Sequence, residues 1–425
     1  MNIIWGLIIS VVNYKLLCKD AAQGIVLFCV LLVCCPVFFW GGLSLQYSYV
    51  FLPFLYIWHK KYNKCNYDIA SAMSPFVWVF LLTLFATVLS LTLYNVKGGV
   101  AAFAIVGTVK SLFIINVLSK TSVFRDRFIF ILTCIILINS VVLCIEFNLL
   151  KIWSPNRVLE TWMRLFGNMG NTGSLESTLE RGGSIGRLHG TFTTSSLVGS
   201  LSMLGIGIFI VKYFQDLRWG SILMVLCSLF VGLCSSSKRF FLGGVAVLVF
   251  CLIIRLFWIR TSKKDYKLPV VIFFLAFIVV VLYNLLGDVL YLDYYLQYLT
   301  EGNIGGSLET RFGEDGAVNA MKTIIVKYWL TGLGEFSIKD VNVTDSQFYC
   351  TFYKSGILGV ALYFGVFYRL ALKTIRLKKS YVAIILFLIV FEFFISTEFF
   401  SPLGLILLSY VICSLYQNKA QVQAH

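Results

Sequence analysis

The feature that most constrains this chain is a series of continuous apolar runs, about 16 to 24 residues each, along nearly its whole length. A helix needs roughly 20 apolar residues to cross the hydrocarbon of a bilayer. In that medium every backbone polar group must be paired within the protein, so only helices and closed barrels can span it. The runs do not alternate between apolar and polar residues. They therefore predict an all-α integral membrane protein.

Composition supports this prediction. Of the 425 residues, 59% are hydrophobic and 13% are charged, whereas a soluble chain is about 25% charged. A chain so poor in charge cannot cover itself with a solvated surface, so lipid must solvate most of it. The net charge of +15 would suit a nucleic-acid partner, but the charges lie in short clusters between apolar runs. That placement is typical of charges that set membrane topology, and we expect no nucleic-acid partner.

The apolar runs predict about twelve transmembrane helices. They are expected near residues 22–40, 43–58, 76–94, 99–118, 128–147, 191–213, 219–234, 240–258, 268–287, 353–372, 380–397 and 401–416. The first twelve residues are apolar but short for a span. They form an interfacial segment, or they continue with residues 13–17 into a thirteenth helix. The start lacks the basic region and the small-residue cleavage site of a signal peptide.

Lysine and arginine residues predict the orientation, because they accumulate in cytoplasmic loops. One set of alternate loops holds nineteen of them, and the opposite set holds twelve, nine of which lie in two long loops where the rule is weaker. The nineteen are Lys15, Lys19, Lys60, Lys61, Lys64, Lys120, Arg125, Arg127, Lys212, Arg218, Arg260, Lys263, Lys264, Lys267, Lys373, Arg376, Lys378, Lys379 and Lys419. Their side is predicted to be cytoplasmic, and the two long loops are predicted to face outward.

This orientation divides the chain into five parts. They are N-terminal helices in 1–147, a first outer loop in 148–190, central helices in 191–287, a second outer loop in 288–350 and C-terminal helices in 351–425. The first loop has six glycines between residues 167 and 186. In the second loop, Ala317, Met321, Ile324 and Tyr328 fall at helical spacing. That spacing predicts an amphipathic helix on the membrane surface, or alternatively a solvent-exposed loop helix.

Three arginines lie at the predicted outer boundary of the membrane, against the usual preference of positive charge. Arg187 lies in GRLHGTF, Arg239 in SSSKRF and Arg311 in SLETRF. A boundary arginine can extend toward lipid headgroups. Three of them beside glycines and small residues on one side favour an anion site, because guanidinium binds phosphate in a bidentate manner.

Other polar residues are candidates for a substrate path or for proton transfer. Lys110 lies in the middle of a predicted helix, where a charge costs about 2.5–3.5 kcal/mol. It either belongs to a path for a lipid headgroup or pairs with an intramembrane acid such as Glu146 or Glu392. Glu309 is near Arg311 and belongs to the same candidate path. His189 is either a second base or a structural neighbour of Arg187.

Carboxylates at the predicted outer face supply candidates for a general base. They are Glu309, Glu314, Asp315, Glu335, Asp340 and Asp345. Asp345 is the strongest candidate, because its stretch runs directly into the next helix, where an apolar setting can raise the pKa of a carboxyl group. Asp345 is alternatively a helix N-cap, and one residue can fill both roles.

No cofactor or metal site is predicted. Nine of the twelve cysteines lie inside apolar runs, and the three histidines are scattered along the chain. There is no P-loop, nucleotide fingerprint, zinc pattern or GxSxG motif. Because the outward face of such a membrane has no ATP, a reaction there must use an activated substrate.

Several of these motifs together resemble the O-antigen polymerase and ligase superfamily. They are Arg-x-x-Gly-Thr-Phe before a helix, Ser-Lys-Arg in a turn two helices later, an arginine opening the second long loop, TGLGEF (331–336), and the D-S-x-F-Y…S-G-I-L-G stretch. The resemblance covers roughly residues 180–365, and the twelve-helix plan with two large periplasmic loops matches over the rest.

The resemblance implies a GT-C-like fold and an inverting, metal-independent glycosyltransferase of the bacterial inner membrane. Its substrate would be a glycan on undecaprenyl pyrophosphate at the periplasmic leaflet, with membrane lipid and a chain-length regulator as further partners. The leaving group is already good, so the chemistry needs cations for the diphosphate and one base for the acceptor hydroxyl. Arg187, Arg239 and Arg311 would supply the cations, Asp345 would be the base, and Arg311 would also act in catalysis.

Two alternatives to a polymerase remain. The ligase pattern usually has a histidine before the G-I-L-G helix, whereas this chain has none between His189 and His425. The Asp345-Ser346 pair is closer to the polymerases, so a ligase that transfers glycan to lipid A–core is the second interpretation. A flippase of lipid-linked oligosaccharide is the third. Transporters tend to have two similar halves, and no internal repeat is visible here.

Overall fold

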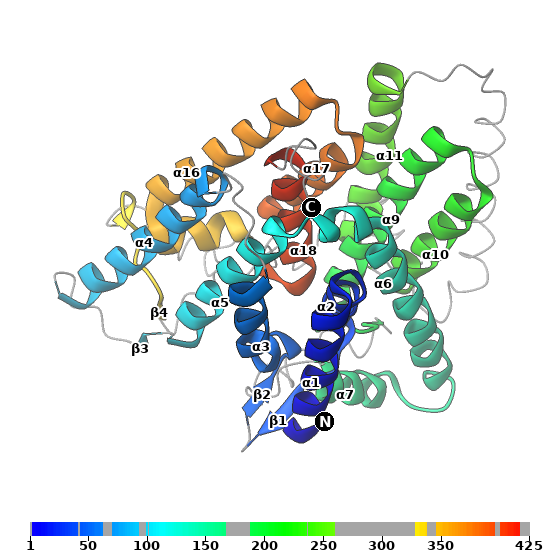
Figure 1. Ribbon diagram of the computed structural model, residues 1–425, viewed down its shortest axis with the longest axis horizontal. Helices are drawn as coiled ribbons and strands as arrows, with labels where there is room; N and C mark the ends of the chain where they lie inside the picture. The colour runs from blue at the N-terminus through cyan, green and yellow to red at the C-terminus, as the bar shows by residue number, and fades with distance from the viewer. Residues whose placement is uncertain are drawn as a thin grey trace. The chain divides into compact units, whose positions relative to one another are not determined.

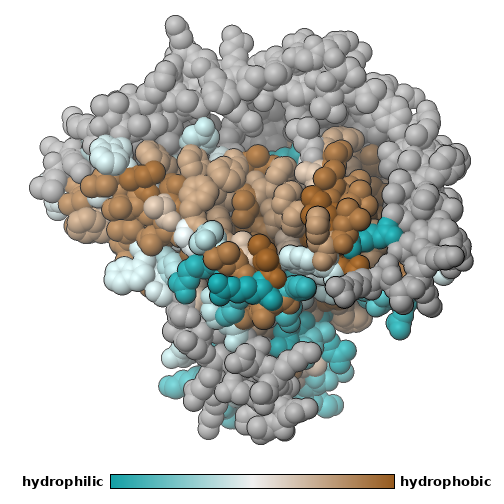
Figure 2. All heavy atoms as spheres, turned by 90° about the horizontal axis from the view of Figure 1, so that it is seen from above, coloured by the Kyte–Doolittle hydropathy of each residue, from teal (hydrophilic) through white to brown (hydrophobic). Residues whose placement is uncertain are grey.

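The helices of this protein present apolar side chains outward as well as inward. The computed structural model describes residues 2–40, 43–62, 70–92, 99–100, 102–166, 188–235, 237–259, 328–337, 346–395 and 400–416. Within them, five helices are long and apolar enough to cross a membrane: Ala72–Thr92, Ser122–Leu149, Ser195–Asp216, Arg239–Trp258 and Gln347–Leu377. Figure 2 shows hydrophobic residues over much of the visible described surface. The protein is an all-α membrane protein.

The chain forms two compact units, each made from two separate stretches of sequence. Unit 1 contains Met1–Tyr62 and Asp126–Glu301, and unit 2 contains Asn63–Arg125 and Gly302–His425. The described elements of unit 1, with α6 starting just before it, are α1 Ile3–Lys19, α2 Ala21–Cys34, β1 Phe38–Trp40, β2 Leu43–Leu45, α3 Tyr47–Tyr62, α6 Ser122–Leu149, α7 Pro155–Phe166, α9 Ser195–Asp216, α10 Trp219–Ser235 and α11 Lys238–Trp258 (Figure 1).

Helix α9 is the central helix of unit 1, because 89% of the residues in its most apolar stretch are buried. Small residues let its neighbours approach closely, as is common between helices in membranes. A Cβ atom on Gly205 would lie 2.7 Å from Ile136 Cδ1 of α6, and α10 and α11 also pack against α9. Helix α9 therefore packs against three helices, α6, α10 and α11.

The described elements of unit 2 are α4 Ala70–Thr92, β3 Gly99–Val100, α5 Ala102–Lys120, β4 Phe336–Ser337, α16 Gln347–Leu377, α17 Ser380–Ile395 and α18 Pro402–Tyr416. Helix α16 packs along α4 and α17, and α18 packs on α5 and α17 (Figure 1). The short strands β3 and β4 pair in an antiparallel manner, which joins the end of the α4–α5 connection to the segment before α16.

Most predicted helices coincide with helices of the structure. Eleven of the twelve overlap a helix within the described residues, and the twelfth, 268–287, lies outside them. The N-terminal residues form a continuous helix, α1, which agrees with the continuation of the apolar start through residues 13–17. Of the four residues whose spacing predicts a surface helix, only Tyr328 lies within the described residues.

The prediction of a helix over 22–40 was wrong at its C-terminal end. Helix α2 ends at Cys34, and Phe38–Trp40 instead pairs with Leu43–Leu45 as a short antiparallel ladder. Pro36 explains the ending, because the residue before a proline disfavours the helical conformation. The strand is fixed to α7, since Val37 N donates a hydrogen bond of 2.8 Å to Leu165 O.

Candidate functional site

A buried acid near the end of α6 holds the segment that follows Arg187. Glu146 has no exposed surface. Its two carboxylate oxygens each accept a hydrogen bond of 3.0 Å from the backbone N–H of His189, and Oε2 accepts a second of 2.8 Å from Gly190 N. The segment is thereby fixed to α6 through its backbone.

Two further side chains complete this cradle, which we define as Asn139, Glu146 and Trp162. Asn139 lies on the buried face of α6 with Glu146, and its Oδ1 accepts from Thr191 N at 3.0 Å and from Thr191 Oγ1 at 2.9 Å. Trp162 Nε1 on α7 donates to Gly190 O at 2.6 Å. Gly190 has a φ of +54°, in the left-handed region that favours glycine. The cradle thus fixes an unusual turn.

The cradle also lies beside the turn that carries Arg239. Leu188 N donates a hydrogen bond of 3.3 Å to Cys234 O, near the end of α10. A Cβ atom on Gly199, in α9, would lie 3.2 Å from Ser237 Cβ at the start of α11. Arg239 occupies the first turn of α11. The structure therefore brings the described part of GRLHGTF and the turn that precedes Arg239 together in unit 1.

A second polar region, in unit 2, surrounds a break in α16. Gly356 inside this helix has φ +60° and ψ −162°, so the helix is interrupted there. The backbone of the preceding loop fills the gap: Leu333 N donates to Tyr353 O at 2.7 Å, and Gly334 N donates to Lys354 O at 2.9 Å. Beyond the break, Ile357 N donates to Trp329 O at 2.9 Å. The TGLGEF and S-G-I-L-G motifs thus pack directly on each other.

The loop carries a buried acid that pairs with a lysine of the broken helix. Glu335 is 7% exposed, and its Oε1 lies 2.7 Å from Lys354 Nζ. Its backbone N–H donates to Thr87 Oγ1 at 2.9 Å, and Ser90 Oγ donates to Leu333 O at 2.8 Å, both on α4. The loop is therefore held between α4 and α16.

Several predicted site residues lie outside the described residues: Arg187, Arg311, Asp345 and Glu309. Of the others, His189 is buried and its backbone N–H donates to Glu146, Arg239 lies in the first turn of α11, and Lys110 is 7% exposed in α5. The N-cap assignment for Asp345 was wrong, because the cap of α16 is Ser346, whose Oγ accepts from Phe348 N at 3.2 Å. The three-arginine anion site stays a prediction.

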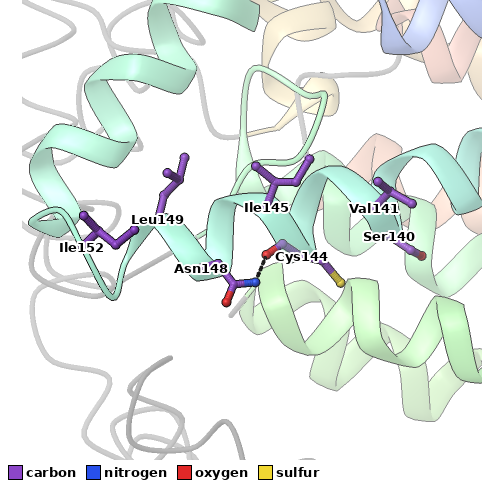
Figure 3. Close-up of a pocket in the computed structure, with 7 residues that line it drawn as sticks. All are labelled: Ser140, Val141, Cys144, Ile145, Asn148, Leu149 and Ile152. Atoms are coloured by element: carbon purple, nitrogen blue, oxygen red, sulfur yellow. Dashed lines mark hydrogen bonds between the residues drawn. The ribbon is translucent and has the colours of Figure 1, made fainter.

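An open groove lies along α6 and the turn after it (Figure 3). Its volume is about 470 Å³, and it is lined by Ser140, Val141, Cys144, Ile145, Asn148, Leu149 and Ile152. Asn148 Nδ2 donates to Cys144 O at 2.8 Å, so its amide is engaged within the helix. The lining carries no charged side chain and suits a hydrocarbon chain, which bilayer lipid can supply. Asn139 and Glu146 of the cradle lie on the buried face of α6 instead.

The geometry of both regions can be compared with known proteins. No family model, curated protein or solved structure matches this chain. The chemical properties of the two regions follow from their own groups: buried acids held by backbone amides or by a lysine, and glycines in left-handed conformations.

Sequence reasoning missed part of both regions. Glu146 was considered only as a partner for Lys110, and Asn139, Trp162 and Lys354 were not singled out. Helix α7 did have a signal, because Val158, Leu159 and Trp162 are buried at helical spacing between charged residues. No sequence signal indicated the partners of Glu146, because they are backbone amides from a segment 43 residues away, and every residue type other than proline has such an amide.

Proposed function

We propose that this protein is an O-antigen polymerase of the bacterial inner membrane, with a GT-C-like fold and its site facing the periplasm. It would transfer a glycan from undecaprenyl pyrophosphate to a hydroxyl group of another lipid-linked repeat. The observation that most supports this proposal is the position of the segment after Arg187: the cradle holds it on α6 and α7, and Leu188 N donates to Cys234 O, near the turn before Arg239. Two motifs that share the superfamily resemblance are thus neighbours in unit 1.

The proposed reaction needs few groups. Guanidinium groups of Arg187, Arg239 and Arg311 would bind the diphosphate and stabilise the charge that develops on it as the bond to the anomeric carbon breaks. Asp345 would accept the proton of the attacking hydroxyl. A new glycosidic bond forms with inversion, and lipid diphosphate leaves. The diphosphate is already a good leaving group, so the paired carboxylates of glycosidases are not needed.

The deciding experiment uses the purified protein in lipid vesicles with a lipid-linked repeat extracted from cells that lack this protein. Mass analysis should find products that grow by whole repeats. Unchanged substrate from a well-folded preparation would contradict the proposal. Polymer transferred to lipid A–core, with no growth on the lipid carrier, would indicate a ligase instead.

A matched pair of arginine variants tests the anion site. Arg239→Ala should lower the elongation rate by at least tenfold, because stabilisation of the charge that develops on the departing diphosphate is typically a large term. Arg164→Ala is the control, since this arginine is exposed on α7 and pairs with Glu160 at 2.6 Å. It should leave the rate within about twofold, as exposed ion pairs contribute little. Equal effects of both variants would remove the proposed role of Arg239.

The break in α16 is one observation that favours a flippase, because interrupted helices are common in transporters. In transporters such breaks lie near the middle of the membrane, whereas Gly356 lies three residues inside the predicted outer boundary at residue 353. Movement of the lipid-linked repeat across vesicles without formation of glycosidic bonds would decide for a flippase.

A further inference from the structure

The pair formed by Glu335 and Lys354 is not required to hold the loop in place. Five hydrogen bonds already attach this loop to α4 and α16: Leu333 N to Tyr353 O, Gly334 N to Lys354 O, Ile357 N to Trp329 O, Ser90 Oγ to Leu333 O and Glu335 N to Thr87 Oγ1. An ion pair with a buried partner is often no more stabilising than apolar side chains of similar volume, because the buried charge, here that of Glu335, loses its hydration. Its presence here therefore calls for another reason.

Among the described residues, the ion pair of Glu335 and Lys354 leaves hydrogen-bonding groups of both side chains unused. Lys354 uses one of its three ammonium donors at 2.7 Å from Glu335 Oε1, and its side chain is 35% exposed. Within the part of the chain that the structure describes, Glu335 Oε2 has no hydrogen-bond partner. The pair thus offers one acceptor and two donors close together, next to accessible space on the lysine side.

The backbone around the pair adopts conformations that favour glycine. Gly332, Gly334 and Gly356 have φ values of +69°, +74° and +60°. Gly332 and Gly334 flank Leu333 in the loop, and Gly356 forms the break in the helix that carries Lys354. The combination at Gly356, with ψ −162°, is essentially restricted to glycine, and such sparsely populated conformations cluster at functional sites, where the surrounding packing must fix them. The same packing fixes the position of both charged groups.

The charges indicate which ligand fits. The Glu335 carboxylate beside the exposed side of Lys354 would repel a diphosphate, so this region does not suit the leaving group. Metal ions are also disfavoured, because a lysine occupies the carboxylate. A sugar hydroxyl is neutral and both donates and accepts, which matches a carboxylate oxygen and an ammonium group. Neighbouring hydroxyls of one sugar can use both groups at once.

We propose that Glu335 and Lys354 bind hydroxyl groups of the acceptor sugar, the one that receives the growing glycan. This inference rests on the proposed polymerase function and assigns the acceptor side of the site. Glu335 and Lys354 orient the acceptor, whereas the removal of its proton stays with the proposed base.

The test separates acceptor from donor. The donor is the lipid-linked repeat extracted from cells that lack this protein, and the added acceptor is the same oligosaccharide released from its lipid by mild acid. The released sugar has no diphosphate, so it acts only as an acceptor. Elongation of the released sugar is measured at varied concentrations of each substrate.

Glu335→Gln keeps the shape of the side chain and should raise the half-saturating concentration of the released sugar by about tenfold or more. The same variant should change the half-saturating concentration of the lipid-linked donor by no more than about twofold. Arg239→Ala should show the reverse pattern. Glu160→Gln, which removes the charge from the exposed pair on α7, is the matched control and should change neither.

A charge exchange separates binding from a structural role. Glu335→Lys combined with Lys354→Glu restores an ion pair, so thermal stability should recover relative to either single variant, while the affinity for the released sugar should not. Recovery of both thermal stability and affinity for the released sugar in the exchanged protein would overturn the inference. An unchanged half-saturating concentration of the released sugar in a well-folded Glu335→Gln protein would overturn it as well. If the wild-type protein elongates nothing, the proposed function itself fails.

Discussion

At the scale of single residues, Glu146 loses its hydration on burial, and it holds the segment that contains His189 and Gly190. Its carboxylate is fully buried and accepts three backbone hydrogen bonds from His189 and Gly190. Replacing it by leucine would leave these buried N–H groups without their acceptor, at a cost of about 1–3 kcal/mol for each unsatisfied group. Glu146→Leu should therefore lower both the thermal unfolding midpoint and the elongation rate.

The conservative variant separates charge from hydrogen bonding at this position. Glu146→Gln keeps one carbonyl oxygen that can accept from the same amides, so its loss of stability should be clearly smaller than that of Glu146→Leu. Thermal unfolding of the purified protein in detergent measures both. If the two variants unfold at the same temperature, the hydrogen bonds to His189 and Gly190 are not what Glu146 contributes.

Gly190 makes a second residue-scale prediction, because its conformation and its surroundings both exclude a side chain. Its φ is +54°, and an added Cβ atom would lie 2.7 Å from Asn139 Oδ1. Gly190→Ala should destabilise the protein by roughly 1–2 kcal/mol, the usual cost of a left-handed residue with a Cβ atom. Gly220→Ala in α10 is the control, since no atom lies within 4 Å of the added Cβ. Equal unfolding temperatures for both variants would contradict this account.

At the scale of elements, the break in α16 depends on one residue. The combination of φ +60° and ψ −162° at Gly356 is essentially restricted to glycine, and other residues pay about 1–3 kcal/mol there. An added Cβ atom would also lie 2.7 Å from Thr331 N. Gly356→Ala should release the loop before β4, and hydrogen exchange at the amides of Leu333 and Gly334 should become faster.

The same helix contains the matched control. Gly365 lies beyond the break in α16, with no atom within 4 Å of an added Cβ. Gly365→Ala should leave the exchange of both loop amides unchanged, and it can stabilise the helix slightly. Slow exchange in the Gly356→Ala protein would show that the loop is held without the break.

The elements also show what the sequence could and could not predict. Long apolar runs gave the positions of α9, α10 and α17 within a few residues, because a continuous apolar stretch fits a membrane helix. Shorter features depend on specific partners. Helix α16 begins at Gln347 rather than near residue 353 because Ser346 caps it and also donates to Phe393 O at 3.3 Å. A polar stretch before an apolar run does not reveal such a cap.

At the scale of the whole molecule, the candidate sites were predictable only in part. The motifs around Arg239 and TGLGEF were recognised from residue types, because arginine and glycine have distinctive chemistry and conformations. Their neighbours were not, since contacts such as Glu335 with Lys354 join different elements. Charge alone placed Glu335 among six outer carboxylates, and Glu335 is the member of that set that lies within the described residues.

The orientation of the chain yields the last prediction. A reporter enzyme that is active only outside the cytoplasm should be active when fused after Phe166, at the end of α7, and inactive when fused after Tyr62, at the end of α3. The reason is that the second position follows a cluster of lysines, which stay on the cytoplasmic side. Helix α1 is about 25 Å long at 1.5 Å per residue, close to the thickness of the hydrocarbon core. Asn2 bridges to Phe39, near the predicted outer turn, so an epitope at the N-terminus should be accessible from outside. The opposite pattern at Phe166 and Tyr62 would put both candidate sites on the cytoplasmic face, where the periplasmic polymerase mechanism could not operate.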